Sequence, residues 1–348
     1  CGLSLHVIVA GTTNPNVEVS QVTVRENVLR DVISGKPTAY NENITFIGNV
    51  TNSQIIDNQI FDGSYIGIDL IGRLYVQAAE DDRYHHYGQP HNILVKGNLI
   101  DTLKPPEGGG TPVGIYLDGA LGPVVIEENI IRHASGIYLN TEWTAWQEGA
   151  YLEPTRNIIV RRNQLLVDDA SSFGLAMGYE TWQNGEECFA YAEGNVALHN
   201  TVIVDQAYRT NLFMCSRDTV WKNNIFVHDN EDLANFHDIY REQTPGDGLI
   251  LDGNLYYSPT AQQQYWYPEI GGFDSLATWQ AGSGQDLAGI FAPPGFEDAA
   301  QGNLTLSQAS SAIDAGVGLT KAVKDGSRTT QLPVADARYF SNGFGLQP

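Results

Sequence analysis

The chain is poor in basic residues. Its 348 residues include 19 Lys and Arg against 41 Asp and Glu, which gives a formal net charge of −22. This shortage opposes binding to nucleic acids and to anionic membranes, because nonspecific phosphate contacts need clustered Lys and Arg. It also disfavours a strongly anionic polymer as substrate unless a cation intervenes.

Sulfur, long apolar runs and helical patterns are scarce as well. Three Cys residues cannot build a disulfide scaffold. No stretch is long and apolar enough to span a bilayer, and we expect no signal peptide within these residues. Cys1 leads directly into a strand-like run at residues 3–11, so we expect a trimmed chain or a fragment. Because no window shows sustained 3.6-residue periodicity, we predict an all-β protein without a membrane span.

A seven-residue motif returns at five points of the sequence. Its second and fourth positions are apolar in every copy, and this period of two is typical of β-strands. The copies are GIDLIGR (67–73), GIYLDGA (114–120), GIYLNTE (136–142), GLAMGYE (174–180) and NLFMCSR (211–217).

A second repeated string, apolar-x-apolar-x-x-Asn-x-apolar, runs between these copies. Its asparagines recur at roughly 24 to 37 residues, a spacing typical of solenoid repeats. They are Asn98, Asn129, Asn163, Asn224 and Asn254, and Asn200 fits the string less well. Asn tolerates left-handed backbone angles, and stacked Asn amides can bond to one another. We therefore place these asparagines at a corner of each turn, in a structural role.

The two repeats together predict a single-stranded right-handed parallel β-helix. Each turn would hold two or three short strands, and stacking would bury one continuous apolar column. In this column we place Ile68, Ile115, Ile137, Leu175 and Leu212. We interpret residues 1–348 as one domain, with repeats over about 17–258, a loop-rich closing segment over 259–348, and long loops on one edge.

The closing segment carries a resemblance to a known family. FDSLATWQAGSGQD (273–286), PGFED (294–298) and LTLSQASSAIDAG (304–316), together with the GIYLDG-type copies, resemble the pectate-lyase-like superfamily of right-handed parallel β-helix proteins. Its secreted bacterial members are mostly of unassigned activity. The resemblance implies secretion and carbohydrate contact, names no substrate, and gives Trp279 and Asp314 a structural part in sealing the last turn.

The outward positions of the seven-residue motif supply the candidate site. If the second and fourth positions point inward, the third, fifth and seventh form one outer face with carboxylates, Tyr, Asn and Arg. We predict Asp118, Glu142 and Asp69 as catalytic. We predict substrate contacts at Arg73, Tyr116, Tyr138, Asn140, Trp143, Trp146, Tyr179, Glu180, Trp182 and Arg217.

The spacing of the carboxylates bears on mechanism. With turns about 4.8 Å apart, Asp118 and Glu142 could reach the roughly 5 Å separation of retaining glycosidases. Asp69 and Glu142 would approach the inverting separation of roughly 6.5 to 9.5 Å. We predict Glu142 as proton donor because Trp143 follows it, and Asp118, more open to water, as nucleophile or base. Asp69 and Arg73 would also position the substrate.

Three insertions, at 74–90, 141–154 and 179–187, follow these outward positions and are rich in aromatic residues. Aromatic rings beside carboxylates suit sugars, because the apolar faces of sugar rings stack on them. His85, His86 and His91 lack the spacing of a metal motif, so we predict no metal ligands. The protein would need no cofactor, although the acids could instead be solvated or bind Ca²⁺.

These residues favour a glycoside hydrolase acting on a polysaccharide or oligosaccharide, and the resemblance implies an extracellular or cell-surface location. One alternative is a polysaccharide lyase, which abstracts a proton with Lys or Arg beside a cation. The other is a non-catalytic glycan-binding adhesin or surface protein. The sequence indicates neither the sugar nor the oligomeric state.

Overall fold

A computed structural model describes most of the chain. The described residues are 5–12, 17–32, 41–72, 88–105, 111–140, 155–168, 173–178, 182–183, 187–188, 192–205, 209–214, 216–229, 234–240, 248–259, 263–267, 271–324 and 330–341.

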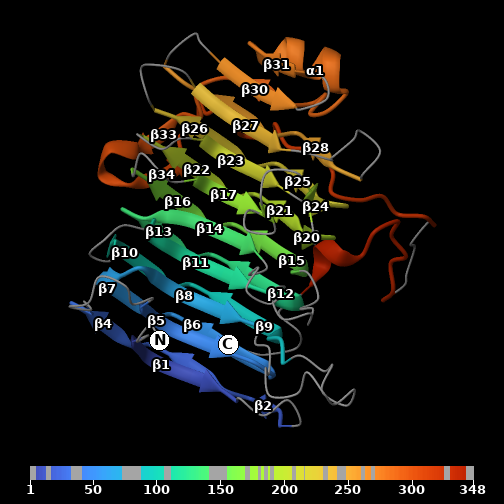
Figure 1. Ribbon diagram of the computed structural model, residues 1–348. Coiled ribbons are helices and arrows are strands. Elements are labelled where there is room, and N and C mark those ends of the chain that lie inside the picture. The colour runs from blue at the N-terminus through green and yellow to red at the C-terminus, as the bar shows by residue number, and fades with distance from the viewer. Residues whose placement is uncertain are drawn as a thin grey trace.

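The chain is a parallel β-helix, as predicted, and each described turn except the last contributes strands to all three parallel sheets (Figure 1). Every pairing described within these sheets is parallel except that of β30 with β31. Sheet A contains β1 (Leu5–Gly11), β5 (Asn41–Ile47), β8 (Ile66–Ile71), β11 (Val113–Asp118), β14 (Ser135–Asn140), β17 (Phe173–Met177), β23 (Arg209–Met214), β27 (Ala234–Tyr240), β30 (Gln263–Tyr267) and β31 (Gly271–Phe273).

Sheets B and C follow sheet A along each turn. Sheet B contains β2 (Val19–Ser20), β3 (Thr23–Arg25), β6 (Val50–Ile56), β9 (His91–Lys96), β12 (Leu121–Glu127), β15 (Arg156–Arg161), β20 (Ala192–Glu193), β21 (Val196–Leu198), β24 (Ser216–Arg217), β25 (Val220–Lys222) and β28 (Ile250–Asp252). Sheet C contains β4 (Val28–Arg30), β7 (Gln59–Ser64), β10 (Leu99–Lys104), β13 (Ile130–Arg132), β16 (Gln164–Val167), β22 (Thr201–Val204), β26 (Ile225–His228), β29 (Leu255–Tyr257) and β32 (Ile290–Phe291).

The predicted inward column is confirmed for four motif copies and wrong for the fifth. Ile68, Ile115, Ile137 and Leu175 pair in register and are buried in the core. Opposite Leu175, however, lies Asn211, and Leu212 pairs with Ala176. The first four copies begin with Gly, whereas the fifth begins with Asn, so no Gly marked its register. A shift of one residue moves every side chain of a strand to the other face.

The asparagine corner is confirmed and is longer than predicted. The backbone N–H and the side-chain amide of each Asn both donate to Oδ1 of the Asn one turn on, as in Asn98 to Asn129 at 2.9 Å for each bond. The same pattern runs through Asn27, Asn58, Asn98, Asn129, Asn163, Asn200, Asn224 and Asn254. Asn200 is thus a full member.

The left-handed backbone of this corner lies one residue earlier than expected. Positive φ belongs to the residue before each ladder Asn, for example Asp57 at 54° and Gly97 at 66°. From Asn58 to Asn254, the amide of each ladder Asn also donates to a backbone carbonyl of the preceding turn, as from Asn129 to Val95 O at 3.0 Å. Buried polar groups need such partners, so the ladder stabilises the corner.

Asp286 accepts the last bonds of the ladder. Its two carboxylate oxygens accept from the backbone N–H of Asn254 at 3.1 Å and from its side-chain amide at 3.0 Å. The hydroxyl of Tyr256 donates to the same carboxylate. Burial raises the pKa of Asp286 to about 6, although these hydrogen bonds oppose the rise.

A short helix closes the C-terminal end of the coil. Helix α1 (Leu276–Ser283) lies beside β30 and β31 at the top of Figure 1. Its Trp279 is fully buried and stacks on Tyr265 of β30, with ring centroids 5.7 Å apart. Ser275 caps the helix in a capping box. Beyond it lie the hairpin β33 (Phe296–Asp298) with β34 (Asn303–Leu306) and the 3₁₀ helices η4 (Ala299–Gln301) and η5 (Arg338–Phe340).

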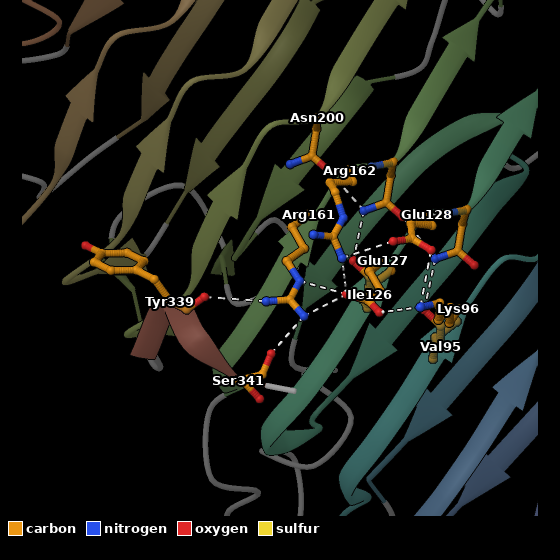
Figure 2. A network of polar contacts seen from close by, with 12 residues as sticks. Val95, Lys96, Ile126, Glu127, Glu128, Arg161, Arg162, Asn200, Tyr339 and Ser341 are labelled. Atoms are coloured by element: carbon orange, nitrogen blue, oxygen red, sulfur yellow. Dashed lines mark hydrogen bonds and ion pairs between the residues drawn. The ribbon is translucent and has the colours of Figure 1, made fainter. Parts of the chain in front are cut away.

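The segment around η5 returns to the outer face of sheet B. Figure 2 shows Arg161, which donates to Ser341 O at 2.8 Å and to Glu127 at 2.7 Å. Burial alone would raise the pKa of Glu127, but hydrogen bonds from Arg161 and Lys96 outweigh it, so that pKa is lowered. Tyr339 is buried against Val196 and Leu198. The C-terminal segment is therefore held by a charged network and an apolar contact.

Candidate functional site

The outer face of sheet A carries a second apolar cluster, separate from the core. It consists of Ile66, Val113, Tyr116, Tyr138, Phe173 and Ala176, with Tyr65 packed against it. Tyr116 and Tyr138 pair in register, and their ring centroids are 6.5 Å apart. Tyr138 and Phe173 continue the row at 6.0 Å. The third motif position therefore faces away from the core in β11, β14 and β17.

Two predicted catalytic carboxylates lie on this face on adjacent turns. Asp69 pairs with Tyr116, and Asp118 lies two residues further along β11, where it pairs with Ile71 and Asn140. One strand spacing combined with two residues along a strand gives a Cα separation of about 8 Å for this pair. Asp69 and Asp118 are thus neighbours on one face.

The predicted accessibility of these carboxylates is wrong. Asp69 is 2% exposed and Asp118 is 4% exposed, whereas we expected Asp118 to be open to water. The physical reason is that the outer face of sheet A has its own apolar cluster, which the alternation of strand residues alone does not reveal. Substitutions at these positions therefore affect a packed region.

The predicted binding residues of β11 and β14 are tethered by hydrogen bonds. Tyr116 accepts from the amide of Asn140 at 3.2 Å, and the Tyr138 hydroxyl accepts from the backbone N–H of Phe173 at 3.1 Å. The backbone of Gly119 donates to Asn140 O at 2.9 Å. These bonds fix the two phenol rings, so the rings form a rigid apolar wall.

Sequence reasoning missed a third carboxylate on this face. Glu42 of β5 is 5% exposed, pairs with Ile66, and accepts from the Thr45 hydroxyl at 3.0 Å. Thr45 in turn pairs with Asp69. The strand Asn41–Ile47 (NENITFI) lacks the glycine of the repeated motif. Its apolar Ile44 and Phe46, two residues apart, were the signal that could have placed it.

Arg217 lies elsewhere than predicted. It belongs to β24 of sheet B, where it pairs with Glu193, and it is not on the outer face of sheet A. The register shift of the fifth motif copy accounts for this difference, because the chain has left sheet A after Met214.

The remaining predicted residues cannot be placed relative to Asp69 and Asp118. Arg73, Glu142, Trp143, Trp146, Tyr179 and Glu180 lie outside the described residues. Trp182 begins β18 (Trp182–Gln183), which pairs with β19 (Glu187–Cys188), and only its backbone is described. The three predicted insertions fall largely in the same undescribed ranges.

Within the described ranges, no group of three or more His, Cys, Asp or Glu residues could hold a metal ion. A role for Ca²⁺ stays a prediction. The helices of the described part include none long and apolar enough to cross a membrane.

Comparison with known proteins gives one distant similarity. No protein-family model matches the sequence. The chain is similar to the uncharacterized protein YwoF of Bacillus subtilis (strain 168), with 22% identity over 265 residues. The match covers 76% of this chain and 53% of the relative, so the chain spans about half the length of the curated relative it matches. The comparison supports no particular activity.

Proposed function

We propose that this protein is an extracellular carbohydrate-active enzyme, a glycoside hydrolase whose site is the outer face of sheet A. The observation that supports it is the pair Asp69 and Asp118 on adjacent turns beside the ring wall of Tyr116 and Tyr138. We also propose that the chain belongs to the pectate-lyase-like superfamily, on its parallel β-helix and its closing segment.

We propose an inverting mechanism, in which the two carboxyl groups are roughly 6.5 to 9.5 Å apart and leave room for a water molecule between them. By strand geometry the Cα atoms of Asp69 and Asp118 are about 8 Å apart, on adjacent turns of one face. Asp118, which ends β11 and pairs with Asn140, is the base that activates this water. Asp69, which pairs with Tyr116 on the neighbouring turn, is the proton donor.

Glu142 remains an alternative proton donor that lies outside the described residues. Hydrolysis is favoured over elimination because a lyase needs a Lys or Arg base beside the substrate. The described residues of β8, β11, β14 and β17 include no Lys or Arg. A non-catalytic glycan-binding protein is the second alternative, since it would need the ring wall but not the carboxylates.

A polysaccharide panel tests this proposal. The protein is incubated with neutral and uronate-containing polymers, and both new reducing ends and the absorbance of unsaturated uronates are followed. We expect new reducing ends without absorbance. Absorbance of unsaturated uronates would show that the protein is a lyase and not a hydrolase. Binding of a polymer without cleavage would show that it is a glycan-binding protein without catalytic activity.

A further inference from the structure

The outer face of sheet B has a row of charged residues that the sheet A site does not use. Leu121, Arg156, Glu193 and Arg217 pair in register on four consecutive turns, from β12 through β15 and β20 to β24. Each is the residue just before a second row, which consists of Gly122, Asn157, Gly194 and Asp218. After Leu121, the side chains of the first row alternate in charge: Arg156 is positive, Glu193 is negative and Arg217 is positive.

All residues of these two rows except Arg217 line a groove. The cavity has a volume of about 590 Å³ and is lined by His91, Leu121, Gly122, Arg156, Asn157, Glu193, Gly194 and Asp218. Pockets that hold small ligands are typically about 300 to 1,000 Å³. The groove crosses the turns, so its long direction follows the axis of the coil. From β12 to β24 it extends over three strand spacings, about 14 Å.

Three of the four residues of the second row have left-handed backbone angles. Asn157, Gly194 and Asp218 have φ values of 56°, 66° and 48°. A Cβ atom at Gly122 would lie 2.2 Å from Asn157 O, and one at Gly194 would lie 2.8 Å from Asn157 Oδ1. Larger residues at these two positions would collide with Asn157. Glycine on both sides of Asn157 therefore lets its amide border the groove.

The lining offers both acceptors and donors of hydrogen bonds. Glu193 and Asp218 are exposed carboxylates, and Arg156 is a half-buried guanidinium. Nδ1 of His91 lies 3.0 Å from Gln89 O, and a carbonyl only accepts, so Nδ1 carries the hydrogen and Nε2 is the acceptor of the neutral ring. Two carboxylates against one guanidinium disfavour an anionic ligand, as does the net charge of −22.

We propose that this groove is a second saccharide-binding site, which holds an uncharged stretch of a polysaccharide along the coil axis. Sugar hydroxyls donate to Glu193 and Asp218 and accept from Arg156 and the Asn157 amide. The choice of a saccharide as ligand rests on the proposed function of sheet A, but the groove lies on a different sheet and is tested separately.

Native electrophoresis in gels that contain a dissolved polymer tests the groove. The polymers are galactomannan and a mixed-linkage β-glucan, both neutral, and polygalacturonate, which is anionic. The protein carries Asp118→Asn in every lane so that the polymer is not cleaved. Glu193→Ala and Asp218→Asn are compared in this background with Glu18→Gln, which removes an exposed carboxylate just before β2 at the far end of sheet B.

We expect retardation by at least one neutral polymer, with a dissociation constant about tenfold weaker for Glu193→Ala, the loss of one charge-assisted hydrogen bond. Asp218→Asn should weaken polymer binding less than Glu193→Ala does, and Glu18→Gln should leave polymer binding unchanged. Thermal unfolding shows whether each variant is folded.

Any of three results would contradict saccharide binding in the groove: no retardation by any neutral polymer, equal retardation of all variants, or retardation by polygalacturonate alone. Cleavage of soluble oligosaccharides by the wild type is read independently. This cleavage assay therefore tests the proposed hydrolase activity separately from binding in the groove.

Discussion

The asparagine corner and the outer face of sheet A repeat with the same pitch but differ in what they repeat. At the corner every turn presents the same residue with the same two bonds, from Asn27 to Asn254. On the outer face of sheet A one register row reads Thr45, Asp69, Tyr116, Tyr138 and Ala176.

This difference separates structural from functional repetition. A ladder of buried amides must be uniform, because the side-chain oxygen of each Asn accepts from both the backbone N–H and the amide of the Asn before it. A binding face must vary, because a ligand presents different groups to successive turns. Changing one position in each region should therefore have different consequences: stability falls at the corner, and the proposed activity is lost on the face.

The largest expected effect is on turnover. Asp118→Asn keeps the shape of the side chain but removes the base, so we expect kcat to fall by roughly 10²- to 10⁴-fold. Initial rates of reducing-end release measure it. Glu18→Gln is the matched control and should keep the wild-type rate. If Asp118→Asn keeps most of the activity, the assignment of the base is wrong.

Asn129→Ala should cost the most stability. It leaves the backbone N–H of buried Asn98 without its acceptor, whereas the Asn98 side-chain amide keeps the carbonyls of Ile55 and Lys96. It also removes the bonds from the Asn129 amide to Val95 O and to Asn163 Oδ1. At about 1–3 kcal/mol for the unsatisfied N–H and about 1 kcal/mol for each further bond, we expect the free energy of unfolding to fall by about 4 kcal/mol.

The matched control is Asn27→Ala, which removes only a donor at the open end of the ladder and should cost about 1 kcal/mol or less. Urea titration measures both. Equal losses would show that the rungs do not act as a chain of donors and acceptors.

Asp286→Asn should make stability less dependent on pH. The pKa of Asp286 is raised by burial from 3.8 to about 6, so the folded state binds the proton more tightly than the unfolded state. Protonation therefore stabilises the fold as pH falls from about 6 towards 4, and this contribution is lost above pH 6. About two pH units correspond to about 3 kcal/mol.

Asn at this position keeps an oxygen for Asn254 and carries no charge. We expect Asp286→Asn to be more stable than the wild type at pH 8 by up to about 3 kcal/mol, and to match it near pH 4. Urea midpoints at pH 8, 6 and 4 measure the difference. A constant difference across this range would contradict the buried-carboxylate explanation.

The smallest effect is expected where the C-terminal segment meets sheet B. Arg161→Ala removes the bonds to Glu127 and Ser341, but Lys96 and Arg162 still contact Glu127. We expect a loss of about 1–2 kcal/mol at pH 7. The pKa of Glu127 is lowered in the folded state, so its contribution exists above the unfolded pKa and disappears as pH falls through the folded value. A loss that is equally large at pH 3 would be inconsistent with this origin.

Much of the fold could be predicted from the sequence because its repeats are physical necessities. The alternation of Ile115 and Leu117 specifies a strand, and the recurring Asn specifies a stacked corner. The same logic failed for Leu212, since an apolar pair two residues apart fits a strand in either of two registers. The burial of one face and the geometry of the flanking turns decide between them.

The candidate site was less accessible to prediction. The sequence places Asp69 and Asp118 on the correct side of the sheet, but exposure depends on what else packs there, which is a tertiary property. Glu42 and the groove beside Arg156 carry no repeated motif. The groove arises from the register of four separate strands and from left-handed residues such as Asn157, and no local pattern encodes that combination.

The bonds of the asparagine ladder all run in one direction, and this polarity determines where the coil can be lengthened. An Asn both accepts from the turn before and donates to the turn after, so a complete turn can be inserted or removed between two rungs without a new solution for the corner. A carboxylate accepts but has no hydrogen to pass on. Asp286 thus ends the ladder. The number of asparagines before it determines the length of every surface that runs along the coil.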